Sequence, residues 1–124
     1  MSRQQGHLAE LQALSYLQLQ GLRLVAQNFQ ARCGEIDLIM CDGKTLVFIE
    51  VRQRTHNRYA RAIHSIDRSK QRRISNTAAL FLQSHPAFQQ HACRFDVITF
   101  DGRIESDTQP RWIRAAFSCR QTIR

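Results

Sequence analysis

The chain has 124 residues, 43% of them hydrophobic, and its 18 lysines and arginines against 10 acidic residues give a formal net charge of +8. This length allows one domain with a hydrophobic core and excludes two, so we expect a single domain over residues 1–124, with residues 117–124 as a loose C-terminal tail. No apolar run is long enough to span a membrane, and the strongly basic balance favours nucleic acid or anionic lipid over an acidic partner protein.

The cysteines and the chain start indicate a cellular location. The opening residues "MSRQQGHLAE" lack the apolar core of a secretory signal, which predicts a cytoplasmic protein. Four cysteines without a closely spaced pair then predict reduced thiols. The missing short ligand spacings disfavour the alternative of a zinc site built from these cysteines and His91.

Residues 3–20 are rich in Leu, Ala and Gln and precede a glycine, which predicts the first helix. At 100° per residue, Glu10 falls inside an apolar arc of this helix. The arc comprises Ala9, Ala13, Leu14, Tyr16 and Leu17. Alternatively, Leu8, Leu11 and Leu19 define the inward face and leave Glu10 solvated at its edge, as the rarity of unpaired buried acids would favour.

Three strands are expected next, at residues 22–29, 35–41 and 45–52. The last two are separated by Asp42 and Gly43, a dipeptide typical of a two-residue hairpin loop. We therefore expect these two strands to form an antiparallel hairpin.

The hairpin loop fixes an expected register. With the Asp-Gly dipeptide as the loop, Asp37 lies opposite Phe48 and Glu35 lies opposite Glu50. Because side chains alternate with a period of two, Glu35, Asp37, Glu50 and Arg52 then cluster at the open end of one face. The other face is wholly apolar, and comprises Ile36, Leu38, Met40, Val47, Ile49 and Val51.

Acids that face each other across a hairpin repel, so this cluster requires positive charge. Arg52 and nearby basic residues could supply it as an ion-pair network. Mg²⁺ could also supply it, because carboxylates, a backbone carbonyl and waters are the hard oxygen ligands that it prefers. The residues alone leave both alternatives open.

A basic run begins directly after the acidic cluster, with one acid among its residues. A basic run by itself is usually a solvated surface, but a carboxylate site with a cationic rim is an arrangement suited to phosphodiester chemistry. The basic residues of the run are Arg52, Arg54, Arg58, Arg61, Arg68, Lys70, Arg72 and Arg73.

A second helix is expected within this region, with Asp67 or Ser69 as its N-cap and Pro86 beyond its end. Its predicted inward stripe consists of Ile74, Ala78, Phe81 and Leu82.

The last predicted strand covers residues 93–100. Its Asp96 is expected to pair with Arg94 or Arg73 in a structural role. The segment "RWIRAAF", residues 111–117, is expected to be an amphipathic tail that covers an edge of the core. The residues expected to make this contact are Trp112, Ile113, Ala116 and Phe117.

The order helix, strand, strand, strand, helix, strand, with its placement of acids, resembles the YraN family of small bacterial proteins. The resemblance lies in the blocks "GHLAELQALSYLQLQGLRLVAQNF", "GEIDLIM", "LVFIEVRQR", "RSKQRR" and "CRFDV…RWIRAAF". That family is grouped with the PD-(D/E)xK nucleases and is similar to archaeal Holliday junction resolvases. The resemblance implies an α/β, restriction-endonuclease-like domain of order α-β-β-β-α-β, with a mixed central sheet flanked by helices.

The same resemblance implies a Mg²⁺- or Mn²⁺-dependent endonuclease that cuts structured or branched DNA. Asp37, Glu50 and the Val51 carbonyl would be the metal ligands. Glu10 would be a further site acid and ligand, and Glu35 would help to position the ligands.

The chain departs from the superfamily pattern at Arg52, which stands where the motif has lysine. An arginine keeps the positive charge but does not lose a proton, so it can act on the phosphate and not as a base. Lys70 would contact a phosphate. The residues expected to bind nucleic acid are Arg54, Arg58, Arg61, Lys70, Arg72 and Arg73.

Two other functions remain alternatives at this stage. One is a non-catalytic nucleic-acid-binding protein that retains the nuclease fold, and the other is a protein-interaction scaffold. A homodimer is also left open, because resolvase-like proteins act as dimers while nothing in this sequence points to a second copy.

Overall fold

The computed structural model describes residues 3–54 and 66–118, except for the side chain of Arg54. The elements are α1 (Arg3–Leu19), β1 (Arg23–Ala31), β2 (Gly34–Asp42), β3 (Thr45–Arg54), α2 (Arg68–Ser84), the short 3₁₀ helix η2 (Pro86–Phe88), β4 (Ala92–Asp101) and β5 (Arg111–Phe117). The two helices and first four strands lie where the sequence predicts them, with ends that differ by at most two residues wherever an end was predicted.

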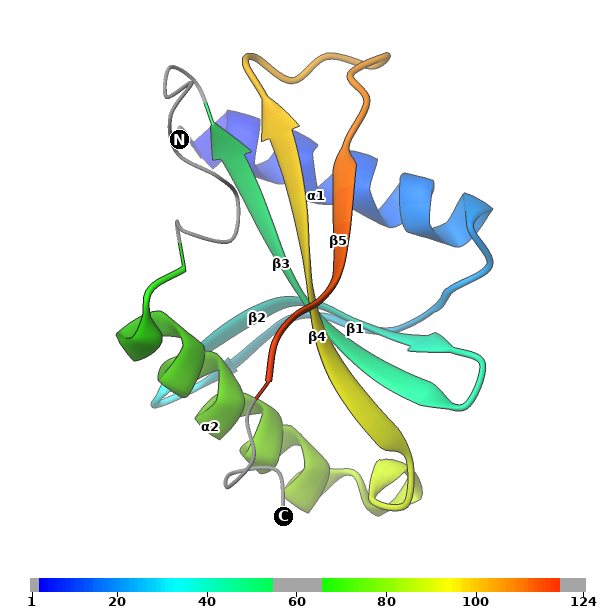
Figure 1. Cartoon of the computed structure of the whole chain (residues 1–124), viewed down its shortest axis with the longest axis vertical. Helices are drawn as coiled ribbons and strands as arrows, with labels where there is room; N and C mark the ends of the chain where they lie inside the picture. Colours follow the sequence, from blue (N-terminus) through cyan, green and yellow to red (C-terminus); the bar gives the residue numbers. More distant parts are fainter. Residues whose placement is uncertain (1–2, 55–65, 119–124) are drawn as a thin grey trace.

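One five-stranded mixed sheet, in the order β1-β2-β3-β4-β5, forms the centre of the molecule. Its neighbouring strands are antiparallel except β3 and β4, which pair in parallel. A parallel pair needs a crossover connection, and α2 lies within that connection. The sheet is strongly twisted, and α1 and α2 lie well apart around it (Figure 1). The expected α/β class with a mixed sheet is therefore confirmed.

The predicted element order is wrong at its end, because residues 111–117 form a fifth strand and not a simple tail. Strand β5 pairs with β4, and Phe117 lies opposite Phe95, with their rings stacked at 4.9 Å. Ala115 interrupts the strand with a φ of 50°, and the β4–β5 register shifts at this point. The expected cover of the core edge is nevertheless present, since Ala116 is buried.

The β2–β3 hairpin differs from the predicted register by two residues. Asp42 pairs with Thr45, so the loop is Gly43-Lys44. Asp42 is kept in the strand by an ion pair between its Oδ2 and the Nη2 of Arg94, at 2.9 Å, a contact that the local turn pattern does not contain. A shift of two residues leaves the side chains of residues 38–41 and 46–49 on their predicted faces, whereas a shift of one would have reversed them.

Two hydrophobic clusters pack on the sheet, one under each helix. The α2 cluster contains the predicted stripe of this helix together with residues such as Phe48 and Phe95, and the α1 cluster contains residues such as Leu38 and Ile98. The predicted apolar face of the hairpin is wrong at Ile36, which packs in the α2 cluster. The alternation thus breaks at the position between Ile36 and Leu38, which is Asp37.

The inward face of α1 is the predicted arc and not its alternative. Ala9, Ala13 and Leu17 are fully buried, whereas Leu11 and Leu19 are 44% and 85% exposed. None of the helices in the described part of the chain is long and apolar enough to cross a membrane.

The N-cap of helix α2 is Asp67, one of the two expected candidates, and not Ser69. The Asp67 Oδ1 accepts a hydrogen bond of 2.8 Å from the backbone N–H of Lys70, an arrangement that satisfies one of the unpaired donors at a helix start.

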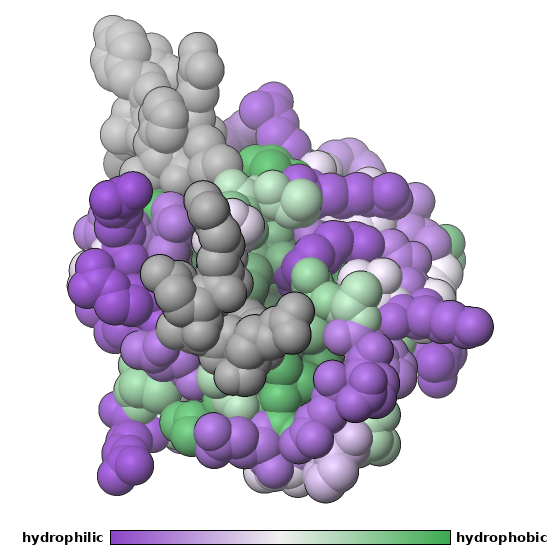
Figure 2. All heavy atoms as spheres, turned by 60° about the horizontal axis from the view of Figure 1, so that its bottom comes forward, coloured by the Kyte–Doolittle hydropathy of each residue, from purple (hydrophilic) through white to green (hydrophobic). Residues whose placement is uncertain are grey.

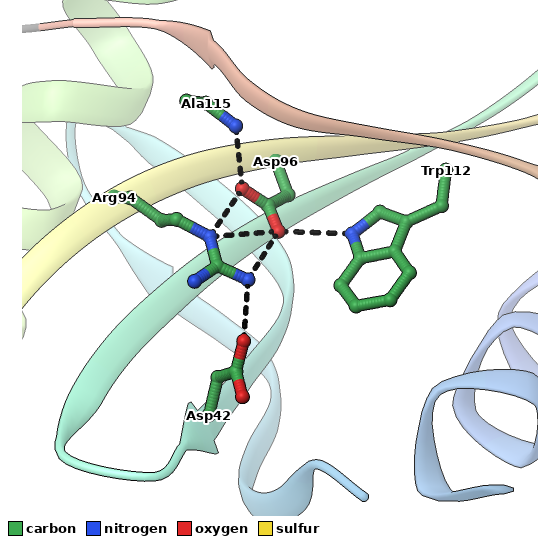
Figure 3. A network of polar contacts seen from close by, with 5 residues as sticks. All are labelled: Asp42, Arg94, Asp96, Trp112 and Ala115. Carbon is green, nitrogen blue, oxygen red and sulfur yellow. Dashed lines mark hydrogen bonds and ion pairs between the residues drawn. The ribbon is translucent and has the colours of Figure 1, made fainter. Parts of the chain in front are cut away.

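Asp96 forms the predicted pair with Arg94 and adds two contacts that the sequence did not predict (Figure 3). Its carboxylate, fully buried, accepts hydrogen bonds from the Trp112 indole N–H and the Ala115 backbone N–H, both at 2.9 Å. Arg94 also binds Asp42, so one guanidinium joins β4 to the end of β2. The network ties three strands together.

Hydrophilic residues cover most of the face shown in Figure 2 and border a strip of hydrophobic ones. Among the large hydrophobic residues of the described chain, Leu11, Leu19 and Leu24 are the exposed ones.

Candidate active site

Asp37 and Glu50 lie at the open end of the β2–β3 hairpin, where the ladder of paired residues ends at Leu38 and Ile49. The next position of that ladder places Asp37 opposite Glu50, in place of the predicted pair of two glutamates. The Oδ2 of Asp37 accepts a hydrogen bond of 2.8 Å from the backbone N–H of Val51. Asp37 is therefore anchored to the segment of β3 that also carries Glu50.

Glu50 is nearly buried, with a side chain only 8% exposed, and two cations approach its Oε2. The Nζ of Lys70 lies at 3.1 Å and the Nη1 of Arg52 at 3.6 Å. The ion-pair network that the sequence left open is thus present. It also places a lysine from α2 beside the glutamate of the Glu-x-Arg pattern.

No residue of the described part of the chain forms a salt bridge with Asp37. Burial is the largest cause that raises its pKa to about 8, and repulsion from Glu50 is the next. Glu10 and Glu35 raise the pKa further, while the hydrogen bond from Val51 lowers it. A carboxyl whose ionised form is opposed by burial and by three acids is well placed to gain from an added cation.

Glu10 and Glu35 are held near this pair by an amide that the sequence analysis missed. The Nδ2 of Asn28 donates to the Oε1 of Glu10 at 2.9 Å and to the Oε2 of Glu35 at 3.2 Å. Within the strand pattern, Asn28 only indicated a polar position. The four predicted acids therefore gather around one end of the sheet, with Asn28 between two of them.

Two adjoining pockets open beside these acids, and Asp37, Glu50 and Lys70 line both. The larger, of about 370 Å³, is also lined by Gly6, Glu10, Val51, Arg52 and Gln53. The smaller, of about 90 Å³, is also lined by Gly34, Glu35, Arg73 and Ile74. A groove lined by both acids and basic side chains therefore runs past the Asp37–Glu50 pair.

Gln53 fixes one wall of the larger pocket. Its Nε2 donates to the Oε1 of Gln5 and to the carbonyl oxygen of Gly102, both at 2.9 Å. Its Oε1 is buried and has no hydrogen-bond partner among the described residues. Buried acceptors are normally paired, so this oxygen is available to a water or another donor in the pocket.

The donors of the site are oxygens of the kind that Mg²⁺ and Mn²⁺ bind. Among residues 3–54 and 66–118, no three His, Cys, Asp or Glu side chains are grouped closely enough to hold a metal ion. Mg²⁺ does not require such a group, since it is commonly held by one or two carboxylates with waters and substrate phosphates. Asp37, Glu50 and the Val51 carbonyl thus fit such an ion, with Gln53 Oε1 able to accept from a bound water.

Part of the expected basic rim borders the site. Arg73 lines the smaller pocket and Arg72 is exposed on the same helix. The side chain of Arg54, together with Arg58 and Arg61, lies outside the described residues. Within the described residues, the cationic rim expected from the sequence therefore lies on the first two turns of α2.

The sequence profile of the uncharacterised protein family UPF0102 matches residues 9–100, a stretch that includes all four acids of the site. The chain belongs to the UPF0102 family. UPF0102 and YraN denote the same family, so the family resemblance is confirmed at this level.

UPF0102 proteins of several bacteria are similar to this chain over nearly its whole length. It is 46% identical to one from Pseudomonas putida over 114 residues, 47% to one from Pseudomonas fluorescens over 116, and 50% to one from Alkalilimnicola ehrlichii over 113. The alignments cover 91–94% of this chain and 86–94% of the relatives. These relatives share the family, and their names assign no activity to them.

Proposed function

We propose that this UPF0102 protein is a metal-dependent endonuclease that hydrolyses phosphodiester bonds of structured or branched DNA. The observation that carries the proposal is the Asp37–Glu50 pair, in which burial and neighbouring acids raise the pKa of Asp37 to about 8 beside a groove with a basic rim. Strongly perturbed acids in a pocket are characteristic of catalytic sites. The resemblance to PD-(D/E)xK nucleases, similar to archaeal resolvases, supplies the reaction class.

Asp37, Glu50 and the Val51 carbonyl are the groups that would hold Mg²⁺ or Mn²⁺. Glu10, on the wall of the same pocket, adds negative charge or a further ligand. A divalent cation held there would lower the pKa of a bound water and stabilise the charge that develops on the scissile phosphate.

Arg52 and Lys70 supply the positive charge of the site. Both contact Glu50, so both lie within a side chain's reach of a phosphate bound beside this acid. Arg52 acts by holding the phosphate and stabilising its charge, because a guanidinium keeps its proton. Lys70 adds a second cation from α2, whereas Arg52 lies on β3.

Flanking phosphates would be held by the exposed arginines at the start of α2. Contacts of this kind fix the position of DNA and carry no direct sequence information. We therefore expect selection by DNA structure and not by base sequence.

The second candidate is a nucleic-acid-binding protein without catalysis. It is favoured by one observation, namely that Lys70 and Arg52 already compensate the charge of Glu50. In that case the acids maintain the fold of the groove, and binding depends on the basic rim alone.

The deciding experiment is a cleavage assay on labelled duplex, single-stranded, flapped and four-way-junction DNA, with Mg²⁺ or Mn²⁺. Asp37→Asn and Glu50→Gln keep the side-chain size and remove the charge. Asp107→Asn, at an exposed position, is the matched control. We expect cleavage that depends on the metal and that falls about 100-fold or more in the two site variants, while the control stays at the wild-type rate.

Each other outcome rejects the endonuclease proposal in a different way. Salt-sensitive DNA binding without cleavage, unchanged in Asp37→Asn, would establish the second candidate. Neither binding nor cleavage at moderate salt would leave the protein-interaction scaffold.

A further inference from the structure

Asn28 adopts a backbone conformation that is unusual within a strand. Its φ is 50°, in the left-handed region, while the residues on either side, Gln27 and Phe29, pair with β2 at Leu38 and Ile36. This conformation costs most residues about 1–2 kcal/mol, and asparagine tolerates it better than others do. Strain of this kind persists when the surrounding structure requires it.

The side chain of Asn28 joins three elements through one amide. Asn28 lies on β1, and its Nδ2 donates to Glu10 on α1 and to Glu35 on β2. An amide nitrogen carries two donor hydrogens, so it can serve both carboxylates at once. Asn28 therefore links two acids that stand 25 residues apart in the sequence.

The position of Asn28 is also specific to the site. The flanking pairs of the β1–β2 ladder place it across from Asp37. Glu10 and Glu35, which it holds, both act on Asp37 and each lines one of the two pockets. The amide thus lies at the junction of the two pockets' acids.

The chemistry of the amide distinguishes it from an ordinary ion pair. An arginine or lysine here would neutralise one of the carboxylates and oppose a bound cation. A neutral donor orients both carboxylates and leaves their negative charge in place. We infer that Asn28 is a positioning residue that holds Glu10 and Glu35 in the orientation in which their charge favours a divalent cation beside Asp37, an inference that rests on the proposed function.

Mn²⁺ binding measured by isothermal titration calorimetry tests this inference without an activity assay. Asn28→Gly is the variant, because glycine adopts the positive φ without strain and removes only the amide. Gln27→Ala, at the exposed preceding residue of β1, is the matched control. We expect Asn28→Gly to weaken Mn²⁺ binding about 10- to 100-fold, the range seen when partners of metal-site ligands are removed, and Gln27→Ala to bind as the wild type does.

The same substitution in a protein that lacks both carboxylates distinguishes a positioning role of Asn28 from a general structural one. In the double variant Glu10→Gln, Glu35→Gln, the amide has no carboxylates to orient, so Asn28→Gly should cause no further loss of Mn²⁺ affinity. An equal loss in both backgrounds, or wild-type affinity in Asn28→Gly, would overturn the inference and leave the proposed function standing. Absence of Mn²⁺ binding in the wild type would overturn the proposed function and this inference with it.

Discussion

Asp96 on β4 is fully buried and Asp37 on β2 is partly buried, and the two aspartates differ in what surrounds their carboxylates. Asp96 accepts from the Arg94 guanidinium, the Trp112 indole and a backbone N–H, so its negative charge is paired and its oxygens are satisfied. Asp37 has one backbone N–H and three acids as neighbours. One sheet therefore contains an acid whose negative charge is paired and another whose negative charge is repelled by its neighbours.

Under the proposed function, this difference separates a structural role at Asp96 from a functional role at Asp37. A buried charge with a full set of partners stabilises one arrangement of the chain, as the Asp96 network does for β2, β4 and β5. A buried acid placed among other acids costs stability, and proteins accept such conflicts mainly at functional sites. The contrast predicts that removing the charge lowers the stability of the fold at Asp96 but does not lower it at Asp37.

The largest expected effect on stability is at Asp96. Asp96→Asn removes the charge that compensates Arg94 and should lower the free energy of unfolding by about 3 kcal/mol, near the low end for broken buried pairs because Asp42 still contacts Arg94. Urea unfolding followed by circular dichroism measures this value. At pH 8, Asp37→Asn should unfold at the same or a higher urea concentration than the wild type. Equal losses in both variants would remove the distinction between the two acids.

A pH series sharpens the comparison at Asp37. Its pKa of about 8 in the folded chain lies above the ordinary value of 3.8, so the folded protein retains a proton that the unfolded chain has lost between these values. The contribution of Asp37 to stability is therefore complete below about pH 4 and is lost as the pH rises through 8. The slope for one proton is at most about 1.4 kcal/mol per pH unit.

Unfolding free energies at pH 5, 6.5, 8 and 9 without divalent cations, in the wild type and Asp37→Asn, measure this dependence. The variant should lose the decline that the wild type shows over this range. A pH dependence that is identical in both proteins would show that Asp37 titrates normally.

The sequence predicted those parts of the fold that depend on local pattern. Alternation and capping residues gave the helices and the first four strands, and the predicted hairpin placed Asp37 and Glu50 near its open end. The hairpin register depends on the contact of Asp42 with Arg94, which lies 52 residues away in the chain. The fifth strand was missed because its alternation is interrupted at Ala115, whose N–H binds Asp96.

The residues of the candidate site also fall into two groups, those that the sequence predicts and those that it does not. Its acids could be predicted because they stand at regular strand and helix positions and match the family pattern. Asn28 and Gln53 could not, since a polar residue in a strand has no evident role until α1 and the loop after β4 are packed against it. The pairing of Lys70 with Glu50 likewise depends on how α2 docks on the sheet.

The smallest expected effect concerns the surfaces beside the two aspartates. Arg73 is exposed on α2 and lines the smaller pocket beside Asp37, whereas Arg114 is exposed beside the Asp96 network, where its guanidinium lies 4.0 Å from the centre of the Trp112 ring. If the groove beside Asp37 binds the DNA backbone, Arg73→Gln should weaken binding to all sequences alike and reduce the salt dependence of the affinity by about one ion. Arg114→Gln removes the same charge and should leave both quantities unchanged.

Fluorescence anisotropy with a labelled four-way junction over a range of salt concentrations measures both quantities for the two variants. Because the variants have the same net charge, a general effect of protein charge would lower the affinity equally in both. A loss confined to Arg73→Gln would therefore locate the DNA beside Asp37. A loss confined to Arg114→Gln would place it beside Asp96 and separate the basic binding surface from the Asp37–Glu50 pair.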